Sequence, residues 1–175
     1  MQKIIIKITQ ENTNLIFDNR IECFILESSL PLSFIERFII EAHKVNKLVL
    51  ISIDEPNITM YKALNPDGFI IDTTKDSNPK KKIKNIQAVA PHSIIGVISR
   101  NRRHEAMLIS ECEPDFIIFK FWQDGFEENN KLLEWYNDLF LIQNAAQIEE
   151  DLKQQTINSD FLILDEKKYK FFVAK

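Results

Sequence analysis

Short apolar segments of strand length recur along this chain, and segments with helical periodicity separate most of them. The strand-length segments are rich in Ile, Val, Leu and Phe, and most of their positions are apolar instead of alternating between apolar and polar. Continuous apolar runs of this length are typical of strands that are buried on both faces. Eight such segments are predicted to be strands: residues 3–8, 21–26, 48–53, 68–71, 93–98, 115–119, 139–142 and 160–164.

The segments between the predicted strands carry apolar residues every three or four positions, as amphipathic helices do. The clearest stripe runs from Leu32 to Val45, and Asn78 followed by Pro79 has the form of an N-cap and a first helical residue. Two later helices are predicted from stripes at Leu132, Trp135, Tyr136 and Leu139 and at Ala145, Ile148 and Leu152, the second of them capped by Asn144.

The repeated order of strand, helix and strand implies parallel strands joined by right-handed crossovers. A closed barrel and an open doubly wound sheet both satisfy this order, and eight strands favour the barrel. The prediction is an α/β fold, a small and reduced (β/α)8 barrel of the TIM type, forming one domain over residues 1–175. The barrel would be reduced because full barrels rarely have fewer than ~200 residues, and residues 9–20 and 165–175 leave little room for helices.

Composition narrows the class of protein. Hydrophobic residues make up 45% of the chain and charged residues 27%, as in ordinary globular domains. No apolar run approaches the ~20 residues that cross a bilayer, and the first residues lack the pattern of a signal peptide. We therefore expect a cytoplasmic protein without a membrane contact. A net charge of −4 provides no basic face for nucleic acid, so no nucleic-acid partner is expected.

Ligands of parallel α/β folds bind at the carboxyl ends of the strands. No His or Cys cluster with zinc spacing occurs in the sequence. Asp54, Asp72 and Asp76 are candidate ligands of Mg²⁺, which takes one or two carboxylates together with water and phosphate oxygens. The alternative is that these residues cap turns and helix starts. The polar residues at or just after the predicted strand ends are Glu27, Asp54, Glu55, Asp72, Asp76, Ser99, Arg100, Lys120, Gln143, Asn144, Asp165 and Glu166.

The segment from Ser99 to His104 places three arginines at the expected start of a helix. Cations there oppose the helix dipole, whereas the backbone N–H groups of a helix start suit an anion. Ser99, Arg100, Arg102 and Arg103 are therefore predicted to bind a phosphate or carboxylate group, so a phosphorylated small molecule is a candidate ligand. The alternative is a solvated face in which the arginines pair with nearby glutamates.

Three motifs between residues 48 and 120 resemble the thiamine phosphate synthase/TenI family. Asn65-Pro66-Asp67-Gly68 is similar to that family's Gly-Ala-Asp-Gly entry into the fourth strand, and Glu113-Pro114-Asp115 resembles its entry into the sixth. The segment from Ile94 to Ser99 is similar to the family's Ile-Gly-x-Ser strand, with one extra residue here between Gly96 and Ser99.

The resemblance implies a barrel transferase of thiamine biosynthesis, which joins a thiazole phosphate to a pyrimidine diphosphate with Mg²⁺. It would place the metal at Asp76 and the pyrophosphate at Ser99 and Arg100. Other segments depart from the family's pattern: no Gly-rich phosphate loop follows the seventh predicted strand, and Asp165 and Glu166 follow the eighth. We therefore expect a diverged relative with weak or no synthase activity. The alternative is a non-catalytic ligand-binding or assembly protein that reuses the barrel.

The first and eighth strands would be neighbours in a closed barrel, and the helices that should cover both are short or missing. Their outward Ile and Leu side chains would contact water unless something lies over them. A homodimer through this seam is one prediction, because a two-fold dimer covers a patch with its own copy. Local cover by residues 15–17 and 169–173 is the alternative.

Overall fold

Eight parallel strands close into a barrel in which the strands follow one another in sequence order and β8 pairs with β1. The computed structural model describes residues 2–53, 58–152 and 156–174. The closed barrel predicted from the sequence is confirmed, and the open sheet is excluded. The strands are β1 (Lys3–Ile8), β2 (Ile21–Glu27), β3 (Leu48–Ile53), β4 (Gly68–Asp72), β5 (Ile94–Ile98), β6 (Phe116–Phe121), β7 (Gln143–Ile148) and β8 (Phe161–Asp165).

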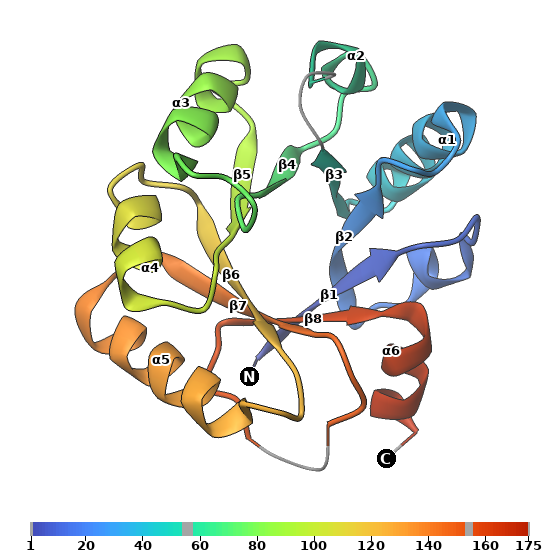
Figure 1. Ribbon diagram of the computed structural model, residues 1–175. Coiled ribbons are helices and arrows are strands. Elements are labelled where there is room, and N and C mark those ends of the chain that lie inside the picture. Colours follow the sequence, from blue (N-terminus) through green and yellow to red (C-terminus); the bar gives the residue numbers. More distant parts are fainter. Residues whose placement is uncertain (1, 54–57, 153–155, 175) are drawn as a thin grey trace.

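The helices lie outside the ring of strands (Figure 1). Asn78 caps α3 as predicted, because its side-chain oxygen accepts a hydrogen bond from the Lys81 N–H. Among the described residues no helix joins β7 to β8, and none of the helices there is long and apolar enough to span a membrane. The helices are η1 (Asn14–Phe17, a 3-10 turn), α1 (Leu32–Lys44), α2 (Ile58–Lys62), α3 (Pro79–Val89), α4 (Arg103–Ser110), α5 (Phe126–Leu139) and α6 (Glu166–Val173).

Apolar side chains form two layers, one inside the barrel and one between the strands and the helices. Ile5, Ile25, Leu50, Ile70 and Ile118 belong to the inner layer. The alternate residues of the same strands point outward and join the larger outer layer. Both faces of each strand are therefore buried, which explains why the strands are continuous apolar runs in the sequence.

The seventh strand lies later in the chain than the sequence predicts. Helix α5 continues to Leu139, and β7 occupies the segment that was expected to be a helix capped by Asn144. The prediction of a strand at 139–142 was wrong, because Ala145 and Ala146 favour a helix by propensity. Here their small side chains are fully buried, one in the inner layer and one in the outer. Gln143 and Asn144 consequently lie at the amino end of β7 and not at its carboxyl end.

Three aspartates brace the amino end of the barrel. Each directly precedes an even-numbered strand and accepts a hydrogen bond from the backbone N–H of the second residue of the strand before it. Asp67 accepts from Val49 at 2.8 Å, and Asp115 accepts from Ile95 at 2.7 Å. Asp160 makes the same bond to β7 at 2.9 Å. These aspartates tie strands together at the end of the barrel that serves stability.

The variant Asp115→Ala is expected to lose about 1–3 kcal/mol of unfolding free energy, because the N–H group of buried Ile95 would lose its partner. The melting temperature should fall by roughly 2–4 °C for each kcal/mol. Thermal unfolding followed by circular dichroism measures this change. The control is Asp138→Ala, at an exposed position of α5, and equal melting temperatures for the two variants would show that the brace contributes nothing.

The seam between β8 and β1 is covered by η1 and α6 of the same chain, so the local cover that was the alternative to a homodimer is present. Ile6 and Ile8 of β1 are fully buried. Tyr169 of α6 is also buried, and its hydroxyl donates a hydrogen bond of 2.8 Å to Asp18 Oδ2 beside η1. Hydrogen bonds from Arg20 hold the pKa of Asp18 well below its usual range, so this carboxyl accepts as a carboxylate at neutral pH.

The outer surface of this cover still carries exposed aromatic rings. Phe17, Phe171 and Phe172 expose 67%, 59% and 49% of their surface. The homodimer through the seam therefore stays a prediction, with these rings as its contact. Light scattering after size exclusion should show a dimer that Phe172→Asp weakens without loss of helical signal, and a monomeric wild-type protein at micromolar concentration would exclude it.

Candidate functional site

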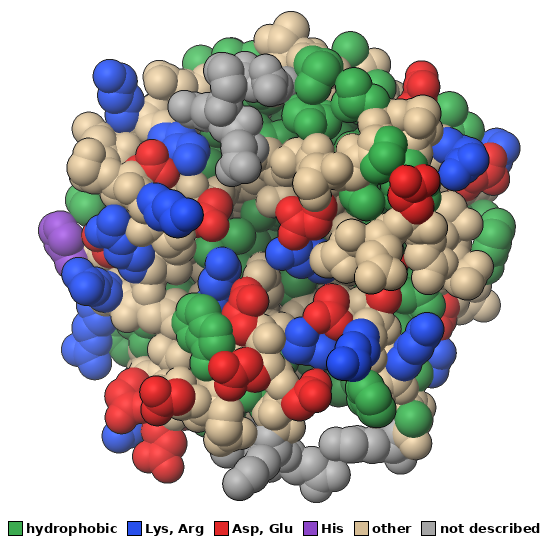
Figure 2. All heavy atoms as spheres, turned by 45° about the vertical axis from the view of Figure 1, so that its right-hand side comes forward, with side chains coloured by type: hydrophobic (Ala, Val, Ile, Leu, Met, Phe, Trp, Pro, Cys, Tyr) green, Lys and Arg blue, Asp and Glu red, His purple; other side chains and the backbone are tan. Residues whose placement is uncertain are grey.

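The two ends of the barrel interior differ in polarity. At the amino end, the rings of Phe116 and Phe161 pack with centroids 5.8 Å apart, beside Ile94 and Cys23. At the carboxyl end, the inward positions that follow the apolar inner layer are polar on seven strands. We call these residues the mouth: Lys7, Glu27, Ser52, Asp72, Lys120, Gln147 and Asp165. Basic and acidic side chains surround a hollow on this face (Figure 2).

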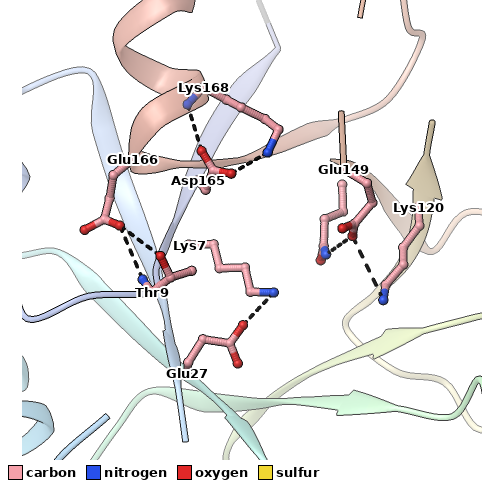
Figure 3. A network of polar contacts seen from close by, with 9 residues as sticks. Lys7, Thr9, Glu27, Lys120, Glu149, Asp165, Glu166 and Lys168 are labelled. Carbon is pink, nitrogen blue, oxygen red and sulfur yellow. Dashed lines mark hydrogen bonds and ion pairs between the residues drawn. The ribbon is translucent and has the colours of Figure 1, made fainter. Parts of the chain in front are cut away.

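One lysine of the mouth and one lysine beside it are held in short ion pairs (Figure 3). Lys7 Nζ lies 2.6 Å from Glu27 Oε1, and each side chain is about one quarter exposed. Lys168, at the start of α6, pairs with Asp165. Partial burial strengthens such pairs, but removing charges from water opposes the gain. These two pairs form a polar rim around the mouth. Their contribution to the free energy of unfolding therefore depends on what else occupies the mouth.

Lys120 is held more loosely. Its Nζ lies 4.0 Å from Glu149 Oε1, and it donates no hydrogen bond within the described part of the chain. The Gln147 amide donates a hydrogen bond of 2.5 Å to the same oxygen of Glu149 and so holds that carboxylate. The N–H groups of the Lys120 ammonium are therefore available as hydrogen-bond donors to a ligand.

Asp72 faces the mouth from the end of β4. Its Oδ1 accepts hydrogen bonds from the backbone N–H and the hydroxyl of Thr74, at 2.9 and 2.6 Å. Burial raises the pKa of Asp72, but the Thr74 hydrogen bonds and the charges of Lys120 and Lys82 outweigh burial and leave the pKa below its ordinary value. Asp72 is therefore a carboxylate at neutral pH, and its Oδ2 takes part in no recorded hydrogen bond within the described residues.

Glu166 lies beside the mouth at the start of α6. Its Oε2 accepts two long hydrogen bonds from Thr9, of 3.4 Å from the backbone N–H and 3.3 Å from the hydroxyl. Its Oε1 is buried without a partner among the described residues. Burial raises the pKa of this carboxyl, and the neighbouring Asp165 adds to the effect. The pKa of Glu166 is thus shifted in the direction opposite to that of Asp72.

The predicted phosphate ligands Ser99 and Arg100 make internal contacts. Ser99 is buried, and its hydroxyl donates a hydrogen bond of 2.7 Å to the Arg100 carbonyl. The Arg100 guanidinium donates to the Thr74 carbonyl at 2.6 Å and pairs with Glu105 at 3.2 Å. These bonds fasten the loop that follows β4 to the start of α4.

The other two arginines make no hydrogen bond to this pair through their side chains within the described residues. Arg102 is the exposed N-cap residue of α4, and the Arg103 guanidinium lies 5.1 Å from the ring centroid of Trp135 on α5. Arg103 thus makes a cation–π contact on the outer surface. Of the four residues predicted to bind phosphate, the structure brings only Ser99 and Arg100 together.

Sulfate or pyrophosphate is expected to raise the melting temperature only weakly, because Ser99 and Arg100 already have partners. High chloride should remove the rise by screening. Thermal shift measurements on the wild type and on the double variant Arg100→Ala, Arg102→Ala test this. An equal rise in both proteins would exclude an anion site at the arginines.

The candidate magnesium ligands do not form a site within the described residues. Asp76 Oδ2 is paired with Lys82 Nζ at 3.0 Å, and Asp72 Oδ1 is taken by Thr74. Asp54 lies outside the described residues, as does Glu55. No cluster of three or more His, Cys, Asp or Glu side chains suited to a metal occurs in the described part of the chain. Magnesium therefore stays a prediction that depends on Asp54.

Sequence reasoning selected Glu27, Asp72, Lys120 and Asp165 at the mouth but missed Lys7, Ser52 and Gln147. Lys7 follows the inward-facing Ile5 by two positions, so alternation along β1 was the signal that places it in the mouth. Gln147 was missed because its segment was predicted to be a helix. In the structure it is buried and follows the inward-facing Ala145 by two positions.

The fold and the mouth define the class of protein: an eight-stranded α/β barrel with a polar site at the carboxyl ends of its strands. No protein-family model and no curated protein matches the sequence. Solved structures match nearly the whole chain. The citrate synthase SbnG has a TM-score of 0.69 at 14% identity, covering 99% of this chain and 91% of its own. A tryptophan synthase from M. tuberculosis has a TM-score of 0.72 at 7% identity, covering 99% and 86%.

A third solved structure, KGPDC from Streptococcus mutans, has a TM-score of 0.65 at 11% identity and covers 95% of this chain and 89% of its own. At such low identities these likenesses show the barrel fold alone. An activity has to be argued from the site itself.

Proposed function

We propose that this protein binds a small polar molecule in the mouth, as a barrel similar to the thiamine phosphate synthase/TenI family but with weak or no synthase activity. The polarity difference between the two ends of the barrel carries the proposal. Inward-facing charges carry a desolvation penalty that apolar residues would avoid. A layer of them at the end where barrels bind ligands therefore indicates a ligand.

The charge of the site favours binding over the coupling of two phosphorylated substrates. Carboxylates outnumber lysines in and beside the mouth, so a pyrophosphate group would meet net repulsion. Ser99 and Arg100, which the family resemblance assigns to pyrophosphate, already donate hydrogen bonds to the backbone carbonyls of Arg100 and Thr74. The acidic residues are Glu27, Asp72, Glu149, Asp165 and Glu166, and the basic residues are Lys7, Lys120 and Lys168.

A thermal-shift and calorimetry screen of sugars, amino acids, nucleosides and their phosphates tests the proposal. At least one compound should raise the melting temperature, and the double variant Lys7→Met, Glu27→Gln should weaken its binding. The matched control is Lys3→Met, Glu22→Gln, which removes an exposed ion pair between the same two strands at the opposite end of the barrel.

A thiamine phosphate formation assay on the same preparation tests the other half of the proposal. We expect no turnover above the rate of the Asp76→Ala variant. Clear turnover that Asp76→Ala abolishes would contradict the proposal and favour a working synthase. If no ligand shows binding that depends on mouth residues, the other part of the proposal, binding of a small polar molecule in the mouth, is contradicted.

A further inference from the structure

Two neighbouring groups of the mouth hold hydrogen-bonding capacity that the described part of the protein does not use. Asp72 offers Oδ2 as an acceptor, and Lys120 offers its ammonium as a donor. Asp72 and Lys120 follow the inward-facing Ile70 and Ile118 by two positions on β4 and β6, with only β5 between them, so both face the same part of the mouth. The positive charge of Lys120, which lowers the pKa of Asp72, agrees with this placement. An acceptor and a donor that face one space, both charged, match a ligand that carries the complementary pair.

The spacing of the two groups limits the size of that ligand. Strand β5 lies between β4 and β6, and Asp72 is in register with Ile118, two residues before Lys120. At ~4.8 Å per strand and ~3.3 Å per residue, the Cα atoms of Asp72 and Lys120 are therefore roughly 12 Å apart. The long lysine side chain spans part of this separation. What remains suits a small molecule in which the ammonium and carboxylate groups are separated by one or two carbon atoms.

The floor between the two groups is apolar. Ile98 ends β5 and is in register with Asp72 on one side and with Ile118 on the other. Ile70 and Ile118 lie one inward position below Asp72 and Lys120 in the inner layer. A carbon skeleton can therefore rest on isoleucine side chains while its charged groups reach the two polar residues.

From this juxtaposition we propose that the mouth binds an α-amino acid or a similarly small zwitterion, with the ammonium on Asp72 and the carboxylate on Lys120. The inference rests on the proposed function, because it names the class of ligand for the same site. A zwitterion adds no net charge to a mouth in which carboxylates already outnumber lysines. An amine without a carboxylate would leave Lys120 without a hydrogen-bond partner from the ligand, and a phosphate would add to the negative charge.

Glu149 is the group that could compete for Lys120. The Gln147 amide holds its Oε1, and the ion pair to Lys120 is 4.0 Å long, beyond hydrogen-bonding distance. A ligand carboxylate that forms a direct, charge-assisted hydrogen bond to Lys120 would interact with it more strongly than Glu149 does over this distance.

Isothermal titration of the standard α-amino acids into the full chain tests the inference. For the tightest binder, the corresponding amine and the corresponding 2-hydroxy acid are titrated as well, and each is expected to bind on the order of tenfold or more weakly. Asp72→Asn should weaken the amino acid but change the hydroxy acid much less, and Lys120→Met should weaken the amino acid but change the amine much less. The control is Lys80→Met, Glu111→Gln, an ion pair between α3 and the residue that follows α4.

The outcomes separate this inference from the proposed function. Amino-acid binding with the two selective losses supports both. If a sugar or a phosphorylated compound binds and depends on Lys7 and Glu27 while no amino acid binds, the inference is wrong and the proposed function stands. If no compound shows binding that depends on any mouth residue, both fail. Circular dichroism of each variant shows that the fold is retained.

Discussion

The variant Gly68→Ala is expected to lose about 3 kcal/mol of unfolding free energy, the upper end of the usual penalty for overpacking. A Cβ atom at this position would lie 2.0 Å from the Ile94 carbonyl oxygen and 2.7 Å from Ile94 Cβ. The carbonyl belongs to the backbone of β5, which is hydrogen-bonded on both sides and cannot move alone. The melting temperature should therefore fall by roughly 6–12 °C, as measured by calorimetry or chemical denaturation.

Gly125→Ala is the matched control for this effect. Gly125 has a φ of 72°, and a Cβ atom added there would have no described atom within 4 Å, so the substitution adds backbone strain without a clash. We expect a loss of about 1 kcal/mol there. Equal losses at the two positions would mean that β4 and β5 can separate to accept a methyl group.

The variant Tyr169→Ala should lose about 3–5 kcal/mol, as is usual when a fully buried aromatic side chain is truncated. Tyr169 anchors α6 over the seam, so its loss would also uncover Ile6 and Ile8 on the outer face of β1. We therefore expect both a lower midpoint of denaturation and an increase in self-association, measured by urea titration and light scattering.

Tyr169→Phe separates packing from hydrogen bonding at the same position. It keeps the ring and removes only the bond to Asp18, which retains its ion pair with Arg20. A loss of about 1 kcal/mol is expected. If Tyr169→Ala is no less stable than Tyr169→Phe, then α6 contributes little to the seam and the local cover described above is not what buries β1.

The strands could be predicted where the residues themselves mark both ends. β1 and β3 are apolar runs with polar residues directly after them, so their bounds follow from the sequence. The same reasoning fails for β7, where two alanines replace β-branched residues. Alanines fit in this strand because of the space left between the barrel interior and α5. Local propensity contains no information about this tertiary packing, so it could not predict the strand.

The motifs behind the family resemblance have structural roles at the amino end of the barrel. Asn65 and Glu113 have positive φ angles of 59° and 52° and begin the tight turns that lead into β4 and β6. Asp67 and Asp115 are two of the bracing aspartates. These parts of the resemblance thus rest on residues that build this kind of barrel. Whether the protein has the family's synthase activity is tested by the thiamine phosphate formation assay.

The site could be predicted only as far as its end of the barrel. The rule for parallel folds selects Asp72, Lys120 and Asp165 from the sequence. Which of them are paired depends on register and on side-chain reach, as the contact of Gln147 with Glu149 shows. The same limit explains why Arg103 looked like part of an anion site although its guanidinium lies over Trp135.

The inward charges of the mouth also lower the free energy of unfolding of this protein, compared with apolar residues at the same positions. Replacing the pair of Lys7 and Glu27 by well-packed apolar residues would extend the inner layer by one level and relieve the desolvation of two charges. Variants selected for heat resistance should therefore accumulate apolar substitutions at the mouth before the amino end, and they should lose ligand recognition as they do so.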